Sequence, residues 1–285
     1  MSSTSLRDKF QTGGTTLWHS LNFWRHGSAA LPLVVVNLLV AVCATAETTN
    51  GLSDAKIQGR QLAQQLCDAR PVGNFTNTGV LQIRDGKGKR SVTPVKCEVI
   101  VTATNWQSVY ETGATNQVVM LGVIHTAGRL NEYFYRTNSA EQVPVLGDIP
   151  ILGHLFRSSP LSGAELMTSF ANSDFWLGDL GLEFFHWPQQ IILKKEFRRN
   201  CSCVVLESTN PNPTTNGYSR LDSWIDEESS GIVMAKAYDA QDRLFKEFYP
   251  KDVKKVKGQW QVESLEIDNV QTGSRTRLEF DLKAP

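Results

Sequence analysis

The chain has 285 residues, of which 41% are hydrophobic, and its 29 Lys and Arg residues balance 29 Asp and Glu residues. A neutral chain without a long block of like charge lacks the basic footprint of a nucleic-acid-binding protein, so this class is excluded. The length suffices for one large β domain or two small domains, with a core that needs no disulfide staples.

An apolar run at residues 29–46, AALPLVVVNLLVAVCATA, predicts a cleaved secretory signal peptide. It follows a segment that carries basic residues, and it ends in Ala-Thr-Ala, with small residues where a signal peptidase reads them. The run is also close to the roughly 20 residues of a membrane-spanning helix. Because it contains a proline and an asparagine, we favour cleavage after Ala46 over a membrane anchor. We therefore expect residues 1–46 to be removed from an exported protein.

Residues 53–69 predict a helix with a narrow apolar stripe. Ser53 can cap the first turn, Asp54 there suits the helix dipole, and Pro71 closes the helix. Because the stripe residues are small, we expect the helix to lie close against a flat partner, most naturally a sheet. The stripe consists of Ala55, Gly59, Leu62, Ala63 and Leu66.

A hairpin and three further strands are predicted next. Residues 79–84 and 95–101 flank the turn DGKGK, and Asp-Gly between alternating segments is a strong hairpin signal. Polar turns separate the following segments, so the strands are expected to form a meander. These further strands are predicted at residues 106–112, 118–124 and 132–137.

The β pattern is interrupted once and then continues to the C-terminus. Residues 138–167 hold prolines and glycines at a density that no regular strand tolerates, and they predict a loop. An aromatic segment follows, and alternating segments separated by polar turns then indicate an antiparallel sheet of many strands. These strands are predicted at residues 203–208, 218–225, 232–238, 243–249, 260–270 and 275–282.

The last predicted strand shows why the sheet needs a cover. Thr276, Leu278, Phe280 and Leu282 alternate with charged residues, so one face is apolar and the other is ionic. An antiparallel sheet with one dry face must bury that face, and a sheet this long curls. The predicted fold class is therefore mainly β, a curled antiparallel sheet whose concave side is filled by helices or by a second sheet.

The aromatic block, defined as Ser169–Pro188, is the densest apolar segment of the predicted exported chain. Ser173 and Asp174 resemble an N-cap, and they precede FWLGDLGLEFFHW, which predicts an aromatic helix. This segment holds more large apolar residues than one amphipathic face can use. It is either a buried plug in the sheet or a lid over an apolar pocket, and the sequence leaves these two interpretations open.

The order of motifs from the aromatic block onward resembles the outer-membrane lipoprotein-sorting (LolA-like) proteins of bacteria. The motifs are the S-D-F block, a strand ending in L-E-S, a W-I-D strand running into a Y-D strand, a W strand and an N-x-x-T-G-x-x-T end. The resemblance covers Ser169–Leu282 well and extends weakly into the N-terminal half through GNFTNTGVLQIRDGKGK and TNWQSVYE.

This resemblance implies an unclosed antiparallel β-barrel with helices in its mouth, around a cavity that holds lipid acyl chains. It implies that residues 47–285 form a single periplasmic lipid-binding domain. The expected role is that of a carrier in outer-membrane lipoprotein sorting, with lipid or lipoprotein acyl chains as ligands. Inner-membrane or outer-membrane lipoprotein-transfer proteins are the expected partners.

The candidate cavity residues are bulky side chains on predicted strands or in the aromatic block. Taken singly, each of them is more often ordinary core, but as a group they favour a cavity. An acyl chain buried there gains about 0.8 kcal/mol per CH₂, so it binds without a polar anchor. The candidates are Trp106, Tyr110, Phe134, Phe175, Trp176, Leu180, Trp224 and Trp260.

A second resemblance supports an alternative function. The segment VPVLGDIPILGHLF at residues 143–156 is similar to a motif near the pore of secretins, the ring-forming outer-membrane channels. The similarity covers this segment alone, and no secretin-like β domain follows it. The alternative is an envelope interaction module that docks through this loop and transports no lipid.

The sequence predicts no enzyme, no cofactor and no metal site. No HExxH, G-x-S-x-G or phosphate-binding glycine loop is present, and His125, His154 and His186 have no metal-ligand spacing. An even number of cysteines in an exported protein permits disulfides, but their pairing stays open. The cysteines beyond the predicted signal peptide are Cys67, Cys97, Cys201 and Cys203.

Overall fold

The computed structural model of the protein describes residues 47–114, 117–139, 159–256 and 259–282. Three segments singled out in the sequence therefore lie wholly or mostly outside the described residues. They are the predicted signal peptide (1–46), the predicted loop (138–167) and the secretin-like segment (143–156).

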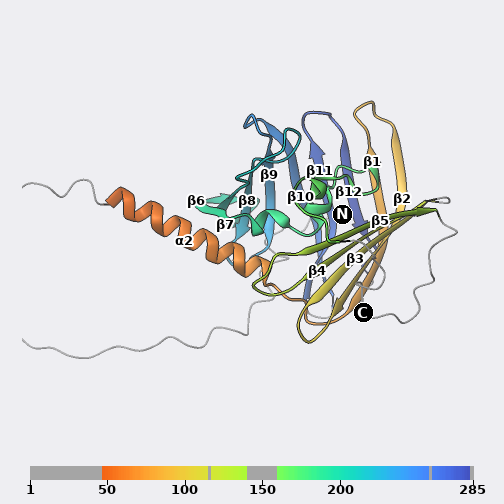
Figure 1. Cartoon of the computed structure of the whole chain (residues 1–285), viewed down its shortest axis with the longest axis horizontal. Coiled ribbons are helices and arrows are strands. Elements are labelled where there is room, and N and C mark those ends of the chain that lie inside the picture. The colour runs from red at the N-terminus through yellow and green to blue at the C-terminus, as the bar shows by residue number, and fades with distance from the viewer. Residues whose placement is uncertain (1–46, 115–116, 140–158, 257–258, 283–285) are drawn as a thin grey trace, which may run out of the picture.

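The strands form one twelve-stranded antiparallel sheet that curls without closing into a barrel, which confirms the predicted fold class (Figure 1). The strands are β1 Phe75–Arg84, β2 Arg90–Val101, β3 Trp106–Ala114, β4 Gln117–His125, β5 Glu132–Ser139, β6 Gln189–Arg198, β7 Cys201–Thr209, β8 Arg220–Asp226, β9 Ile232–Tyr238, β10 Leu244–Val256, β11 Gln259–Asn269 and β12 Arg275–Phe280. Their order is β5-β4-β3-β2-β1-β12-β11-β10-β9-β8-β7-β6. Two meanders thus meet where β1 pairs with β12, and β5 and β6 are the edges.

Alternation along the strands separates a concave face, which carries the main core, from a convex face that carries charged residues and two smaller apolar clusters. Leu81, Leu121, Leu206 and Ile267 come from four strands, and each is buried in the main core at 1% exposure or less. Leu278 of β12 belongs to the same core, whereas its charged neighbours in the strand point to the other face. The core therefore lies inside the curl, as an antiparallel sheet with one wet face requires.

Helix α2 (Glu47–Cys67) begins before the predicted cap at Ser53 and continues through Asn50 and Gly51, so the predicted start was wrong. The predicted stripe is confirmed, since Gly59 and Ala63 are buried and its other members are partly buried. α2 packs on the edge strand β6. A Cβ at Gly59 would lie 2.6 Å from the carbonyl oxygen of Gln190, so a glycine is needed where the helix touches the strand.

Strand β6 was not predicted, because it lacks alternation: Ile191, Ile192 and Leu193 are contiguous, and charged residues follow them. It pairs with β7, and a register shift between Ile192 and Lys194 interrupts the pairing. Its other side forms the end of the sheet. An edge strand with one neighbour and a bulge leaves only a weak pattern in the sequence.

The predicted single helix in the aromatic block was wrong. The chain forms short turns instead: η2 Gly163–Met167 just before the block, and η3 Phe170–Asn172, α4 Leu177–Leu180 and η4 Glu183–His186 within it. Left-handed backbone at Ala171, Asn172 and Leu182 interrupts helical geometry between them. Ser173 and Asp174 lie between η3 and α4, outside any helix. The first turn of α4 is capped by Asp179, whose carboxylate accepts from the Trp176 amide at 2.8 Å.

Candidate functional site

The aromatic block fills the concave side of the sheet. Phe170, Phe175, Leu177, Phe184 and Phe185 are buried in the same core as the inward-facing strand residues. In Figure 1 this green segment lies within the curl of the sheet. The apolar face is therefore covered by one contiguous stretch of chain rather than by a second sheet.

Trp176 is the centre of an aromatic cluster between the block and the sheet. Its ring stacks on Tyr218 at a centroid distance of 4.2 Å and meets the edge of Phe245 at 5.4 Å. The Lys246 ammonium lies 3.6 Å from the centroid of the Trp176 ring. A cation held over a tryptophan face away from water is a strong contact, so Trp176 is fixed by stacking and by charge together.

Lys246 of β10 is a buried cation that faces the aromatic block. Its ammonium donates to the main-chain carbonyl of Asp174 at 2.6 Å and lies 4.0 Å from Oδ2 of Asp179. Burial lowers the pKa of Lys246 to about 8, against the opposing effect of Asp179. Burial likewise raises the pKa of Asp179 to about 6, although Lys246 and the Trp176 amide favour the ionised form. We call Lys246, Asp174 and Asp179 the buried ionic network.

Asp174 connects the block to β12. Its carboxylate accepts from Ser274 Oγ at 2.6 Å and from Thr276 Oγ1 at 2.9 Å, and its amide donates to Thr276 Oγ1 at 2.9 Å. Asp174 belongs to the S-D-F motif, and Thr276 is the last residue of the N-x-x-T-G-x-x-T end. Two motifs that are distant in the sequence thus form one polar contact in the fold.

A second polar contact lies at the other end of the block. Asn131 donates to the carbonyl of Gly181 at 2.8 Å, and a Cβ at Gly181 would lie 2.3 Å from the Tyr133 hydroxyl. Burial raises the pKa of the nearby Glu183 to about 7, while a hydrogen bond with Tyr133 opposes the rise. This acid therefore titrates near neutral pH.

A cavity of about 180 Å³ lies between the C-terminal end of α2, β3 and the aromatic block. Trp106 and Leu180 line it, and the imidazole of His125 stacks on Trp106 at a centroid distance of 4.9 Å. Burial lowers the pKa of His125 to about 4, so this ring is neutral at pH 7. The wall beside Trp106 therefore carries no charge at that pH.

The predicted cavity residues divide between the two faces of the sheet. Trp106, Tyr110, Phe175, Trp176 and Leu180 lie on the concave side, where the Tyr110 hydroxyl donates to the Leu180 carbonyl at 3.5 Å.

The other candidates do not join this group. Phe134 and Trp224 are buried in separate clusters on the convex side, Phe134 with Val109 and Trp224 with Cys203. Trp260 belongs to β11, but its side chain lies outside the described part of the chain.

Lys246, Asp179 and Tyr218 fix the block to the sheet, and none of them was predicted as a site residue from the sequence. Lys246 lies opposite Ala237, whose side chain is in the core, so its strand register points it inward. A lysine at an inward position of an alternating strand was the available signal. A register shift in β10 between Leu244 and Lys246 obscures this signal in the sequence.

No three His, Cys, Asp or Glu side chains are grouped in the described part of the chain to hold a metal ion. The described helices include none with the length and hydropathy to cross a membrane. The cysteines whose pairing the sequence left open, Cys67, Cys97, Cys201 and Cys203, are free thiols.

The fold and the filled concave face define a half-open antiparallel barrel with a discrete helical cover. Several solved structures are similar to this chain in fold, among them three from different organisms. One is a DUF1329 family protein from Desulfovibrio piger, with a TM-score of 0.61 and 20% identity over 80% of this chain and 91% of that chain. Another is a putative outer membrane lipoprotein-sorting protein domain from Vibrio parahaemolyticus, with a TM-score of 0.60 and 17% identity over 79% of this chain and 91% of that chain. The third is a LolA superfamily protein from Nitrosomonas europaea, with a TM-score of 0.51 and 15% identity over 81% of this chain and 94% of that chain.

A protein-family model with the description "Uncharacterized protein" matches residues 152–282, which include the aromatic block and the C-terminal strands. Comparison with curated proteins finds no match. The resemblance to lipoprotein-sorting domains that the motifs indicated is thus confirmed at the level of the fold.

Proposed function

We propose that this protein is an exported, periplasmic lipid carrier that binds lipoprotein acyl chains on the concave face of its sheet and performs no chemistry on them. The observation that carries the proposal is the discrete cover: one stretch of chain, rich in aromatic residues, lies over an apolar wall. The shared fold with a putative outer membrane lipoprotein-sorting protein domain supports it. We further propose that residues 47–285 act as one domain after cleavage at Ala46.

In the proposed mechanism the aromatic block moves away from the wall and acyl chains take its place. The cavity beside Trp106 and Leu180 is the natural starting point, since it already separates the block from β3. An acyl chain of about fourteen carbons gains roughly 11 kcal/mol on burial at about 0.8 kcal/mol per CH₂. That gain offsets contacts of Trp176 and its neighbours that are lost when the block moves, so acyl-chain uptake competes with closure of the block. Transfer then requires a membrane partner with higher affinity for the chains.

The test is the lipid content of the purified protein, measured by solvent extraction and mass spectrometry. We expect co-purified lipid with intact acyl chains, and we expect Trp176→Ala to change its amount severalfold. Trp224→Ala is the matched control, because Trp224 is a buried tryptophan on the convex face. Thermal unfolding of both variants separates a changed lipid load from a lost fold.

Two results would contradict the carrier function. One is lipid-free protein that also fails to bind fatty-acid probes. The other is an equal effect of Trp176→Ala and Trp224→Ala on lipid load in folded protein. Lipid-free protein that captures an envelope partner only when residues 143–156 are present would favour the interaction module instead.

A further inference from the structure

The convex face carries a row of arginines that is separate from the lipid site. Arg84 of β1 lies directly opposite Arg90 of β2 and directly opposite Arg275 of β12. Three guanidinium groups thus come from neighbouring positions on three adjacent strands. Like charges directly opposite each other destabilise a sheet, so this row needs a compensating anion.

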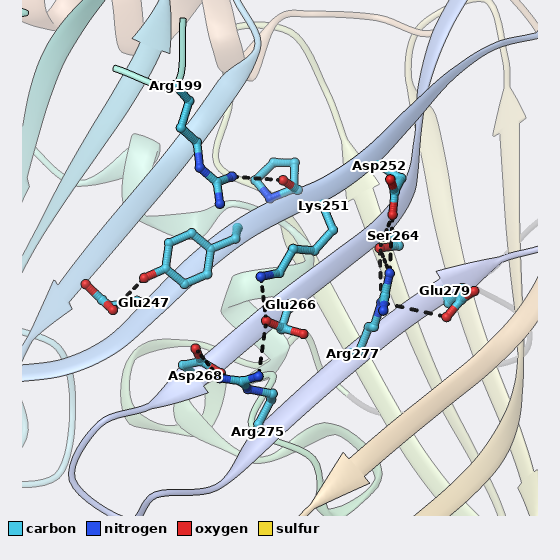
Figure 2. A network of polar contacts seen from close by, with 12 residues as sticks. Arg199, Glu247, Lys251, Asp252, Ser264, Glu266, Asp268, Arg275, Arg277 and Glu279 are labelled. Atoms are coloured by element: carbon cyan, nitrogen blue, oxygen red, sulfur yellow. Dashed lines mark hydrogen bonds and ion pairs between the residues drawn. The ribbon is translucent and has the colours of Figure 1, made fainter. Parts of the chain in front are cut away.

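Acidic side chains compensate only one end of the row. Arg275 pairs with Asp268 and lies 3.8 Å from Glu266, and the adjacent Arg277 pairs with Asp252 at 3.2 Å (Figure 2). The residues that make these contacts, labelled in Figure 2, belong to β10, β11 and β12. Glu266 also pairs with Lys251 at 2.8 Å. Asp252, Glu266 and Asp268 are therefore all engaged by cations of β10 and β12.

Arg84 and Arg90 have no such compensation. Among the described residues, no acidic side chain forms an ion pair or hydrogen bond with either of them. The nearest acid in the sequence, Asp85, uses its carboxylate to accept from the main-chain amides of Lys87 and Lys89, both at 2.9 Å. Asp85 therefore shapes the turn, and the two guanidinium groups stay available.

The arginines surround an open cavity of about 330 Å³. Arg84, Arg90, Arg275 and Arg277 line it, with Glu266 as the single acid in the lining. Strands rather than loops hold all five residues, so the donors keep their spacing.

A close contact between turns also fixes this part of the sheet. A Cβ at Gly86 would lie 2.2 Å from the carbonyl oxygen of Thr272. The β1–β2 turn therefore rests on the β11–β12 turn, which holds Arg84 and Arg90 beside Arg275.

We propose that this cavity is a binding site for a phosphate group. Guanidinium groups present paired N–H donors that match phosphate oxygens, and a doubly charged or diester phosphate supplies the anion that the row lacks. The phosphate can belong to a soluble phosphate compound or to the headgroup of an anionic lipid. The site lies on the face opposite the proposed acyl-chain site, so it does not depend on the carrier function.

The experiment compares the wild-type protein with Arg84→Gln/Arg90→Gln. The matched control is Lys56→Gln/Arg129→Gln, which removes two exposed positive charges from α2 and the β4–β5 turn. Binding of inorganic phosphate is measured by calorimetry at constant ionic strength. Co-sedimentation is measured with vesicles of phosphatidylglycerol in phosphatidylcholine and with vesicles of phosphatidylcholine alone.

We expect the arginine variant to lose at least about tenfold in affinity, as the loss of charge-assisted hydrogen bonds implies, and the control to stay within about twofold of wild type. Arginine-dependent binding of inorganic phosphate supports a soluble source, and arginine-dependent binding only to phosphatidylglycerol vesicles supports a lipid headgroup. The proposal is overturned if the wild type binds neither probe, or if the arginine and control variants bind alike. Equal unfolding midpoints for the three proteins show that the differences arise at the site.

Discussion

Removal of the buried cation Lys246 is the sharpest test of how the aromatic block is held. Its ammonium is 1% exposed, donates to the Asp174 carbonyl, lies 4.0 Å from Asp179 and faces the Trp176 ring. Lys246→Met keeps much of the side-chain volume but leaves Asp179 as a buried acid without its cation. Breaking a buried pair on one side costs about 3–5 kcal/mol, and the loss of a desolvated cation–π contact adds roughly 2 kcal/mol.

The double variant Lys246→Met/Asp179→Asn separates charge from packing. Replacing both members of a buried pair by neutral groups is often neutral or stabilising, so we expect the double variant to regain the whole loss. Urea unfolding of wild type, both single variants and the double variant gives the coupling free energy. Lys254→Met, a half-exposed lysine of the same strand, is the control and should change the free energy of unfolding by less than about 1 kcal/mol.

The pH dependence of Lys246→Met provides a second measurement. Without the cation, the pKa of Asp179 rises further, above the value of about 6 that burial already gives it. A folded-state pKa above the unfolded one stabilises the fold at low pH, and this stabilisation is lost as the pH rises through the folded-state pKa. The variant should therefore be least stable near pH 8 and recover toward pH 5. A loss below about 1 kcal/mol, or no rescue by Asp179→Asn, would refute the role assigned to the buried ionic network.

Two further predictions concern α2 and Glu183. Gly59→Ala should lower the free energy of unfolding by about 1–3 kcal/mol, because the added methyl meets the β6 backbone. Gly51 has open space around it, so Gly51→Ala should stabilise α2 by up to about 1 kcal/mol. Chemical denaturation measures both changes. The pKa of Glu183 is raised to about 7 in the folded protein, so the protonated acid stabilises the fold. This contribution to the free energy of unfolding is complete below pH 4.5 and is lost as the pH rises to 8, a loss of no more than about 3 kcal/mol. Glu183→Gln should flatten that part of the pH profile, and an unchanged slope would contradict burial as the cause.

Local signals in the sequence predicted most of the sheet. The Asp-Gly turn located the β1–β2 hairpin, and the pairing of Arg84 with Arg90 agrees with it. The alternation in β12 gave the buried face of that strand, and the small stripe around Gly59 gave the close contact of α2 with a sheet. Such features depend on the period of one element or on one turn, so a single sequence contains them.

Features that depend on long-range pairing could not be predicted. Alternation shows which residues of one strand share a face, but the pairing register decides which of the two faces is concave. Phe134 pairs with Gly122, which lies between the core residues Leu121 and Val123, so Phe134 points away from the core. The contact of Asp174 with Thr276 joins residues that are 102 positions apart. No spacing rule connects such residues, so motif order indicated the fold but not the contact.

The choice of an ionic anchor for an aromatic cover bears on the proposed movement. A fully apolar interface would match or exceed the stability of one that contains Lys246 and Asp179, because burying both charges costs hydration. When the block leaves the wall, the apolar contacts are lost, but these two charges regain water. The buried ionic network therefore orients the block when it is closed and lowers the free-energy cost of opening it, compared with an apolar cover of equal area. A cover that must give way to acyl chains needs both properties, so we expect Lys246→Met/Asp179→Asn to stay folded and yet release its cover more slowly than the wild type.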